Sequence, residues 1–251
     1  MAKVALVTGA ARRIGRAIAL ALARDGWDIA VHFRDSESEA LAVVAEIEAL
    51  GRRAAALQCD LADEGAVKQL LARASAAVGA VSCVVNNASL FDYDSAPDFT
   101  VAQLDAHMHA NLAAPILLAQ ALHAATAAGQ LAVVINLLDQ KLYNLNPDFL
   151  SYTLSKAALH TATTLLAQAL APTVRVVGVA PGITLVSGPQ SETGFGAAHQ
   201  ATPLGRSSTP EDVADSVCFV ARARAMTGTT LLVDGGQHLI PLQRDVMFIA
   251  L

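Results

Sequence analysis

The sequence is poor in charge, in aromatic residues and in cysteine. Of its 251 residues only 16% are charged and 4% are aromatic, whereas 54% are hydrophobic. This balance excludes the disordered class, whose segments are polar and highly charged. The three cysteines, Cys59, Cys83 and Cys218, stand apart and have the spacing of neither a disulfide framework nor a metal site. We therefore expect a buried core with reduced cysteines and no bound metal.

The chain also lacks a long apolar run and a basic surface. No stretch approaches the roughly 20 uninterrupted apolar residues of a membrane-spanning helix. The net charge of −5 does not favour nucleic acid. Met1-Ala2-Lys3 leads directly into the strand-like run Val4–Val7, without a signal-peptide pattern. We expect a cytoplasmic protein whose partner is a small molecule, neither a membrane nor a nucleic acid.

Short aliphatic runs alternate with longer stretches of helical spacing along the whole chain. This alternation predicts one α/β domain, residues 1–251, with a doubly wound, seven-stranded parallel sheet between two layers of helices. The strands are expected at Val4–Val7, Ile29–Phe33, Ala54–Gln58, Cys83–Asn86, Leu131–Leu137, Val174–Val179 and Thr230–Val233. The helices are expected at Ile14–Arg24, Ser36–Leu50, Asp63–Ala77, Thr100–Ala128, Tyr152–Leu170 and Pro210–Ala223.

Two local patterns add detail to this outline. Ser36 is followed three residues later by Glu39, which predicts a capping box at the start of the second helix. Residues 183–208 are rich in Gly, Ser, Thr and Pro, lack a firm helical period and exceed the usual length of a connection. Long loops of this kind are often functional. We interpret the segment as a substrate loop over a pocket, with a loose surface loop as the alternative.

A glycine-containing turn, Thr8 to Gly15, follows the first strand. Gly9 permits a tight turn, and Gly15 permits close packing of the next helix. The N-terminus of that helix offers backbone N–H groups and a partial positive charge to a pyrophosphate. Glycines also punctuate ordinary strand–helix turns, so the position of this turn, as the first in a doubly wound chain, is what favours a dinucleotide site.

The end of the second strand distinguishes between nicotinamide cofactors. A site that prefers NAD places a carboxylate there for the ribose 2′-OH, but here Arg34 comes first and Asp35 second. Arg34 and Arg12 can clamp a 2′-phosphate through charge-assisted hydrogen bonds, which predicts NADPH. A small rotation of the turn would bring Asp35 to the ribose instead, and a solvated Arg34 that only ends the strand is the other alternative.

Tyr152 and Lys156 are four residues apart within a predicted helix, so both side chains project from one face. A free tyrosine has a pKa near 10, and a neighbouring ammonium stabilises its phenolate. The pair is therefore suited to proton transfer, although its spacing is common by chance and needs support from other motifs.

That support comes from a pattern across essentially the full chain, which resembles the short-chain dehydrogenase/reductase family. The resembling pieces stand in the family's order: Gly9 to Gly15, Asp60, Asn86-Asn87-Ala88, Asn111, Tyr152 to Lys156, and Pro181-Gly182. The resemblance implies a Rossmann fold. It also implies a cofactor site composed of Gly9, Arg12, Arg13, Ile14, Gly15, Arg34, Ser36, Asp60, Leu61, Asn87, Ala88, Ser89, Tyr152, Lys156, Pro181 and Gly182.

The same resemblance implies roles for the catalytic residues. Tyr152 would donate the proton in reduction, and Lys156 would hold the nicotinamide ribose. Asn111 would support a water that relays protons, and Asp60 would hold the adenine. Asn87 and Ala88 would line the cofactor.

Two departures from the family pattern narrow the expected substrate. Arg13 stands where the family usually has a third glycine, and Asp139 stands where a serine usually follows the fifth strand. A carboxylate cannot imitate a neutral hydroxyl that donates to a ketone oxygen. Paired with Tyr152, it can instead recognise or protonate a nitrogen-rich heterocycle.

This combination resembles the pteridine reductase branch of the family, including the bacterial dihydromonapterin reductases. The resemblance implies that Phe91 stacks on a pterin and that Arg13 and Ser89 contact the pterin or the cofactor phosphates. Asp139 and Tyr152 would complete the substrate site and supply the proton. We therefore expect an NADPH-dependent reductase of a dihydropterin such as dihydromonapterin or dihydrobiopterin, with dihydrofolate as a further candidate.

The sequence leaves alternatives for the chemistry and for two site residues, and it also makes a prediction about assembly. An NADPH-dependent carbonyl reductase that tolerates Asp139 is the nearest, and a noncatalytic dinucleotide sensor belongs to another class. Phe91 can be a packing residue, and Asp139 can be a carboxylate that caps a loop. The apolar helix faces and the apolar tail Leu239–Leu251 predict burial against other subunits, and similar enzymes suggest a homotetramer.

Overall fold

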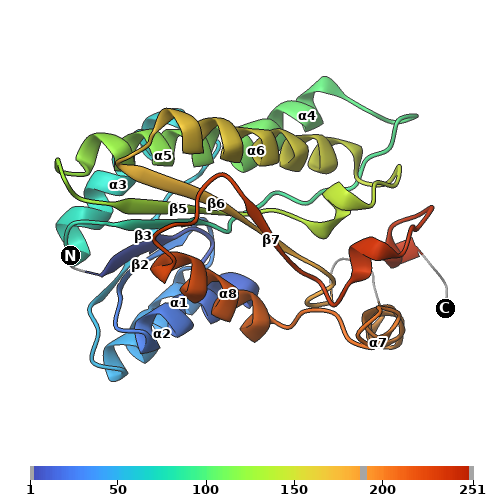
Figure 1. The fold of residues 1–251 in the computed structure, drawn as a ribbon, viewed down its shortest axis with the longest axis horizontal. Helices are drawn as coiled ribbons and strands as arrows, with labels where there is room; N and C mark the ends of the chain where they lie inside the picture. The colour runs from blue at the N-terminus through green and yellow to red at the C-terminus, as the bar shows by residue number, and fades with distance from the viewer. Residues whose placement is uncertain (1–2, 187–190, 249–251) are drawn as a thin grey trace.

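A computed structural model shows a parallel sheet between two layers of helices (Figure 1). It describes residues 3–186 and 191–248. Seven strands lie in the order β3-β2-β1-β4-β5-β6-β7, which confirms the predicted doubly wound sheet. The strands are β1 Val4–Val7, β2 Asp28–Phe33, β3 Ala54–Gln58, β4 Cys83–Asn86, β5 Ala132–Leu137, β6 Val174–Pro181 and β7 Thr230–Val233. The α-helices are α1 Arg13–Arg24, α2 Glu37–Ala49, α3 Glu64–Val78, α4 Val101–Met108, α5 Ala114–Ala125, α6 Leu150–Ala169, α7 Glu192–Gln200 and α8 Pro210–Arg222.

Both faces of the sheet are buried, which explains the near-continuous apolar strands. Successive side chains of β1 alternate between the two layers, as strand geometry requires. Ala5 and Val7 pack in the core beneath α1, α2 and α8, while Val4 and Leu6 pack in the core beneath α3, α5 and α6. Parallel strands joined by helical crossovers are covered on both sides in this way.

The predicted helix Thr100–Ala128 is wrong in one respect, because the structure divides it. A π-helical turn, η1 His109–Ala113, separates α4 from α5, and α5 ends at Ala125. Pro115 lies in the first turn of α5. Within a regular helix its ring would clash with the carbonyl of the residue four positions earlier, which is Asn111. The wider π-turn relieves that clash and turns Asn111 into the buried interior.

Two other local predictions also need correction. The segment 183–208 contains a helix, α7, whose first turn is capped by the Ser191 side chain, while residues 187–190 of that prediction lie outside the described residues. Ser36 precedes α2 but its side chain makes no cap hydrogen bond. The Glu39 carboxylate instead accepts a hydrogen bond from Ser38 Oγ at 2.8 Å and lies 3.6 Å from Arg12, so no capping box forms.

The remaining described segments carry three short 3₁₀ turns. These are η2 Gln140–Tyr143, η3 Gln237–Leu239 and η4 Val246–Phe248. Residues 249–251 of the predicted apolar tail lie outside the described residues. Among the helices of residues 3–186 and 191–248, none is long and apolar enough to cross a membrane.

Candidate active site

Two cavities open at the carboxyl ends of the strands and share part of their walls. One has a volume of about 580 Å³ and extends from the glycine turn to the ends of β2 and β3. The other has a volume of about 430 Å³ and lies beside Asp139 and Tyr152. Arg13, Ile14, Asn87 and Ser89 line both. Dinucleotides bind outside the carboxyl ends of such strands, against the glycine turn, so we call the first the cofactor cavity. We call the second, beside Asp139 and Tyr152, the substrate cavity.

The glycine turn packs directly against the loop after β4. Gly9 has φ +62°, in the left-handed region that glycine adopts readily. A Cβ atom at Gly15 would overlap the carbonyl oxygen of Gly9 and lie 2.5 Å from Nδ2 of Asn87. That Nδ2 atom donates to the carbonyl oxygens of Thr8 and Gly9, at 2.9 and 3.2 Å. The two loops therefore form one rigid wall of the cofactor cavity.

Arg13 stands where the family pattern has its third glycine. The backbone conformation at this position is one that glycine adopts more readily than other residues. Its φ is +55°, a left-handed conformation that is uncommon for a residue with a side chain. The Arg13 guanidinium crosses to the loop after β6, where Nη1 donates to the carbonyl oxygen of Val186 at 2.9 Å. Arg13 thus links the glycine turn to the segment that follows β6, at the junction of the two cavities.

His32 holds the glycine turn through a hydrogen bond to Gly9, a role that the sequence analysis did not predict. Its Nδ1 accepts the backbone N–H of Gly9 at 3.0 Å, so Nε2 carries the proton and donates to the carbonyl oxygen of Cys59 at 3.1 Å. Burial lowers the pKa of His32 to about 4, which keeps the ring neutral. The available signal was a histidine near the end of β2, directly after the apolar run Ile29–Val31.

The far end of the cofactor cavity fits a phosphorylated ribose. Arg12, Arg34 and Ser36 all line it, and both arginine side chains are more than half exposed. Each arginine is near a carboxylate that a phosphate can replace: Arg34 Nε lies 2.6 Å from Asp35, and Arg12 lies 3.6 Å from Glu39. The α1 helix begins without a side-chain cap, which leaves its N-terminal turn to a phosphate.

Asp60 and Leu61 line the same cavity after β3, where an adenine would lie. The Oδ1 atom of Asp60 accepts the backbone N–H of Ala62 at 2.9 Å. The predicted residues Gly9, Ile14, Gly15, Asn87, Ala88 and Ser89 also line this cavity, whereas Pro181 and Gly182 line the substrate cavity. The residues present therefore fit a phosphorylated dinucleotide.

Asp139 and Tyr152 form a hydrogen-bonded pair at the wall of the substrate cavity. The Tyr152 hydroxyl donates to Oδ2 of Asp139 at 2.7 Å, and Oδ1 accepts the backbone N–H of Lys141 at 2.8 Å. Burial raises the pKa of the Asp139 carboxyl, and the two hydrogen bonds offset this only in part. Burial and the neighbouring Asp139 charge raise the pKa of Tyr152 well above its ordinary value. Both groups therefore hold their protons more tightly than free side chains do.

Lys156 lies below this pair on α6. Its Nζ donates to the carbonyl oxygen of Leu137 at 2.8 Å and lies 5.8 Å from the centre of the Tyr152 ring. Burial lowers the pKa of Lys156 to about 8, although Asp139 favours its charged form. One helix thus carries both residues into the cavity, as the spacing of four predicts.

Asn111 lies in the buried π-turn and contacts the loop after β4 instead of Tyr152 or Lys156. Its Oδ1 accepts the backbone N–H of Leu90 at 2.7 Å, and its Nδ2 donates to Leu90 O at 2.9 Å and to Ser155 Oγ at 3.0 Å. Asn111 therefore holds that loop against α6. Its role with a relay water remains a prediction.

Phe91 belongs to an aromatic cluster at the mouth of the substrate cavity. Phe149 stacks on its ring with centroids 4.3 Å apart, and Tyr152 lies edge-on at 4.6 Å. Phe91 remains 38% exposed and lines the cavity, so part of its ring is accessible to a flat ligand. Phe149 has φ +54° and directly precedes α6, which positions both its ring and Tyr152.

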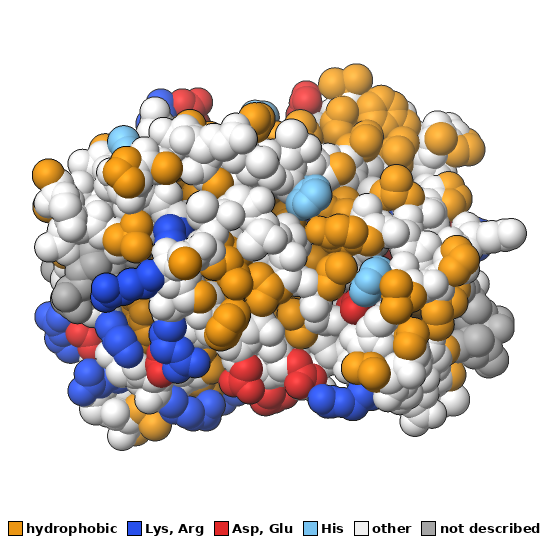
Figure 2. Space-filling view, in the orientation of Figure 1, with side chains coloured by type: hydrophobic (Ala, Val, Ile, Leu, Met, Phe, Trp, Pro, Cys, Tyr) orange, Lys and Arg blue, Asp and Glu red, His pale blue; other side chains and the backbone are white. Residues whose placement is uncertain are grey.

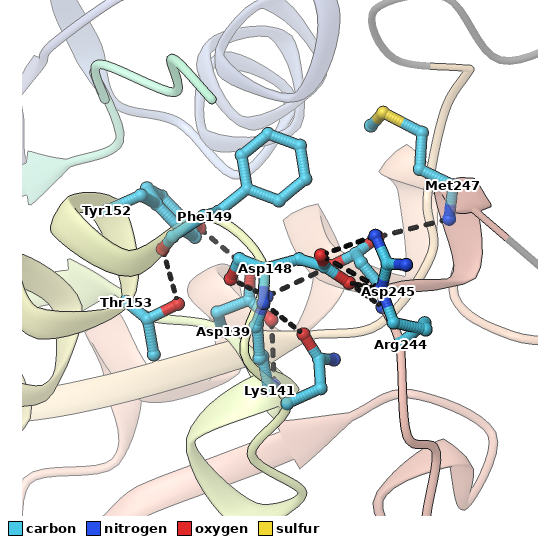
Figure 3. A network of polar contacts seen from close by, with 10 residues as sticks. Asp139, Lys141, Asp148, Phe149, Tyr152, Thr153, Arg244, Asp245 and Met247 are labelled. Carbon is cyan, nitrogen blue, oxygen red and sulfur yellow. Dashed lines mark hydrogen bonds and ion pairs between the residues drawn. The ribbon is translucent and has the colours of Figure 1, made fainter. Parts of the chain in front are cut away.

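The C-terminal segment lines the substrate cavity and was not among the predicted site residues. Asp245, Val246 and Met247 form part of the cavity wall. Figure 3 shows Arg244 and Asp245 of this segment beside Asp148. Arg244 is held to Asp148 by two parallel contacts, Nε to Oδ2 and Nη2 to Oδ1, both at 2.8 Å. No local period marks these residues, because their partners are 96 or more residues away in the chain.

Among the described residues, no group of three or more His, Cys, Asp or Glu side chains could hold a metal ion. The site is instead an acid–base pair, a lysine and two joined cavities. This arrangement can bind an extended dinucleotide and present a second ligand to a proton donor. It defines a hydride-transfer enzyme of the nicotinamide type.

Comparison with known proteins gives the family. Residues 9–238 match the family model described as "Enoyl-(Acyl carrier protein) reductase". The chain belongs to the short-chain dehydrogenase/reductase family and is an oxidoreductase.

Three relatives illustrate the range of this family. The chain is similar to FolM alternative dihydrofolate reductase 1 from Brucella canis, solved in complex with NADP, at 39% identity, 94% coverage of each chain and a TM-score of 0.89. It is 33% identical to L-rhamnose 1-dehydrogenase (NAD(P)(+)) of a Sphingomonas species, covering 94% of this chain and 96% of the relative. It is 32% identical to 3-oxoacyl-[acyl-carrier-protein] reductase FabG of Staphylococcus epidermidis, covering 95% and 100%.

Proposed function

We propose that this oxidoreductase is an NADPH-dependent reductase of dihydropterins. The observation that carries the proposal is Asp139, hydrogen-bonded to the Tyr152 hydroxyl at 2.7 Å where the family usually has a serine. The likeness to the Brucella protein, whose title names an alternative dihydrofolate reductase and NADP, supports both the substrate class and the cofactor.

The Asp139–Tyr152 pair explains why a carboxylate suits this reaction. If Tyr152 alone gave up its proton, a phenolate would face an ionised Asp139, and two like charges would share a buried site. If Asp139 is protonated first, donation by Tyr152 and reprotonation from Asp139 leave a single negative charge. The raised pKa of Asp139 makes this doubly protonated state accessible. The pair is then a proton reservoir for a substrate nitrogen.

When bound, NADPH would supply the hydride for this reduction. The substrate accepts the hydride at the carbon of a C=N bond and the proton at its nitrogen, so the double bond becomes a single bond. Lys156 holds the ribose of the cofactor and keeps the nicotinamide next to Tyr152. Phe91 supplies an aromatic surface for the flat ring system, and Arg13 and Ser89 contact the pterin or the phosphates at the junction of the cavities.

The nearest competing function is a carbonyl reductase, which the likeness to the FabG protein favours. A steady-state assay of NADPH oxidation with dihydromonapterin, dihydrobiopterin, dihydrofolate and a panel of ketones distinguishes the two. We expect turnover of a dihydropterin and a loss of about 10²-fold or more in kcat for Asp139→Ser. Turnover confined to ketones, with Asp139→Ser equal to or better than wild type, would establish the carbonyl reductase instead.

For the assembly we propose a cytoplasmic homotetramer. Exposed apolar side chains on the helices support burial against other subunits: Leu154 and Leu165 on α6 are 45% and 59% exposed, and Val101 on α4 is 64% exposed. Figure 2 shows hydrophobic side chains spread over the half that carries α4, α6 and the C-terminal segment, while Lys and Arg gather beside α1 and α2. Light scattering after size exclusion tests this, and a monomer would refute it.

A further inference from the structure

The C-terminal segment, residues 241–248, reaches the active site in the same chain and contacts the aromatic cluster. The Phe248 ring lies 5.3 Å from Tyr93 and 6.0 Å from Phe149. Its attachment to the catalytic helix is electrostatic: Asp148, two residues before α6 begins, is buried and bound by Arg244. Burial alone would favour neutral Asp148, but the Arg244 hydrogen bonds and the Asp245 N–H hold its pKa below the ordinary value.

Within this segment, Asp245 is the residue that carries charge to the cavity wall. Its carboxylate pairs with the buried Lys141 ammonium, with Oδ2 to Nζ at 3.2 Å, and its Oδ1 accepts the Met247 N–H at 3.1 Å. Lys141 Nζ also donates to the carbonyl oxygen of Asp148 at 2.6 Å. The backbone N–H of Lys141 meets the Asp139 carboxylate (Figure 3). One lysine thus links the segment to the proton-donating pair.

We propose that Asp245 is a positioning residue that acts through electrostatics: its charge, held at the cavity wall by Lys141, keeps the Asp139–Tyr152 pair protonated for reduction. The inference rests on the proton-donor role assigned to that pair under the proposed function. It adds a residue from the far end of the chain to the catalytic chemistry.

The charges around the pair show why Asp245 is needed. The titratable groups that face Asp139 are Tyr152 and Lys156 from α6, Lys141 from η2, Asp245 from the C-terminal segment and, across the same cavity, Arg13 from α1. Three of these five are cations, and one of them, Lys156, lowers the pKa of Asp139. Asp245 opposes them, and it acts on both members of the pair, raising the pKa of Asp139 and of Tyr152.

The test is the pH dependence of kcat at saturating NADPH and substrate. Activity requires protonated Asp139, so kcat falls as pH rises through the midpoint of that titration. Asp245→Asn removes the charge and keeps the shape, so the fall moves to lower pH. The variant matches wild type well below its new midpoint, falls behind between the two midpoints and stays several-fold lower above the original one. Asp245→Glu keeps the charge and a midpoint close to wild type. Asp215→Asn, an exposed acid on α8, is the matched control and leaves the profile unchanged.

Deprotonation of Lys156 could also lower activity as pH rises. It would not reproduce the Asp245→Asn result, because the Asp139 charge raises the pKa of Lys156. A variant in which Asp139 ionises earlier would therefore lose the Lys156 proton at higher pH, not at lower pH. Profiles of Asp245→Asn and wild type that coincide, or that differ by the same factor at every pH, would overturn the proposal and leave the segment a purely structural role.

A readout without substrate separates this inference from the proposed function. In protein labelled with ¹³C at the aspartate carboxyls, the Asp139 signal is assigned by its absence in Asp139→Asn and titrated by NMR. We expect its midpoint to fall in Asp245→Asn. If that occurs while no dihydropterin is reduced, the proposed function fails and the electrostatic role of Asp245 stands. If dihydropterins are reduced and the midpoint does not move, the inference alone fails.

Discussion

The cofactor cavity and the substrate cavity are built in contrasting ways. The cofactor cavity is made from consecutive strand–turn–helix units, and most of its walls come from residues 9–90. The substrate cavity joins segments around residues 139, 152, 183 and 245, and the contacts that hold it include pairs 96 residues apart. The first depends on backbone geometry at a few glycines. The substrate cavity depends on buried charged groups, whose pKa values change when a neighbouring charge is altered.

The largest expected effect comes from changing the backbone of the cofactor cavity. In Gly15→Ala the new Cβ overlaps Gly9 O and crowds Asn87, so the two loops must separate. We expect destabilisation of about 3 kcal/mol or more and loss of measurable NADPH binding by fluorescence titration. Gly196→Ala is the matched control, because a Cβ there meets nothing within 4 Å. Binding by Gly15→Ala with wild-type affinity would show that the close approach of the loops is not required.

A smaller effect is expected at the phosphate end of the same cavity. If Arg34 binds the 2′-phosphate as predicted, Arg34→Ala removes a charge-assisted hydrogen bond, and the Kd for NADPH should rise by about 10- to 100-fold. The Kd for NADH, which lacks that phosphate, should change little. Arg52→Ala, an arginine outside the cavity, serves as control. An equal rise in the Kd values for NADPH and NADH would show that Arg34 does not bind the 2′-phosphate.

The smallest effect is expected for Asp139→Asn in the substrate cavity. It tests whether the buried charge there lowers the stability of the folded chain. The pKa of Asp139 is raised by burial, so the folded chain binds this proton more tightly than the unfolded chain. Wild-type stability therefore falls as pH rises through the window between the two pKa values, and the ionised carboxylate weakens the fold above it. Asp139→Asn should melt a few degrees higher than wild type at neutral pH.

That difference should disappear below the unfolded-state pKa of about 3.9, where both states of the wild type are protonated. Melting curves by circular dichroism from acidic to neutral pH measure it. A variant that is less stable than wild type at neutral pH would mean that the Asp139 hydrogen bonds outweigh the cost of its burial.

The fold was largely predictable because its signals are local. Buried parallel strands appear as apolar runs, and the predicted strands agree with the structure to within two residues at each end. The π-turn at Asn111 was not predicted, since apolar spacing continues through it and only Pro115 marks the change. The helix α7 was missed because its two glycines and two alanines give no apolar period.

The site was predictable only in part. The glycine turn, Tyr152 and Lys156 were predicted from their spacing, and Asp139 was singled out by comparison with the family's serine; the structure places these residues in the walls of the two cavities. His32, Lys141 and Asp245 were not predicted, because their roles depend on partners that the folded chain brings from distant segments. Arg34 could be predicted as a cofactor-site residue because it directly follows β2, and the end of that strand has a fixed place beside the cofactor cavity.

The central claim is that Asp139 and Tyr152 protonate a pterin nitrogen, and a crystal structure with NADP⁺ and a dihydropterin tests it most directly. We predict a flat ring against Phe91, with a ring nitrogen within hydrogen-bond distance of the Tyr152 hydroxyl and Asp139 behind it. A pterin bound away from this pair, or one that presents only its carbonyl oxygen to Tyr152 with Asp139 turned aside, would contradict the account.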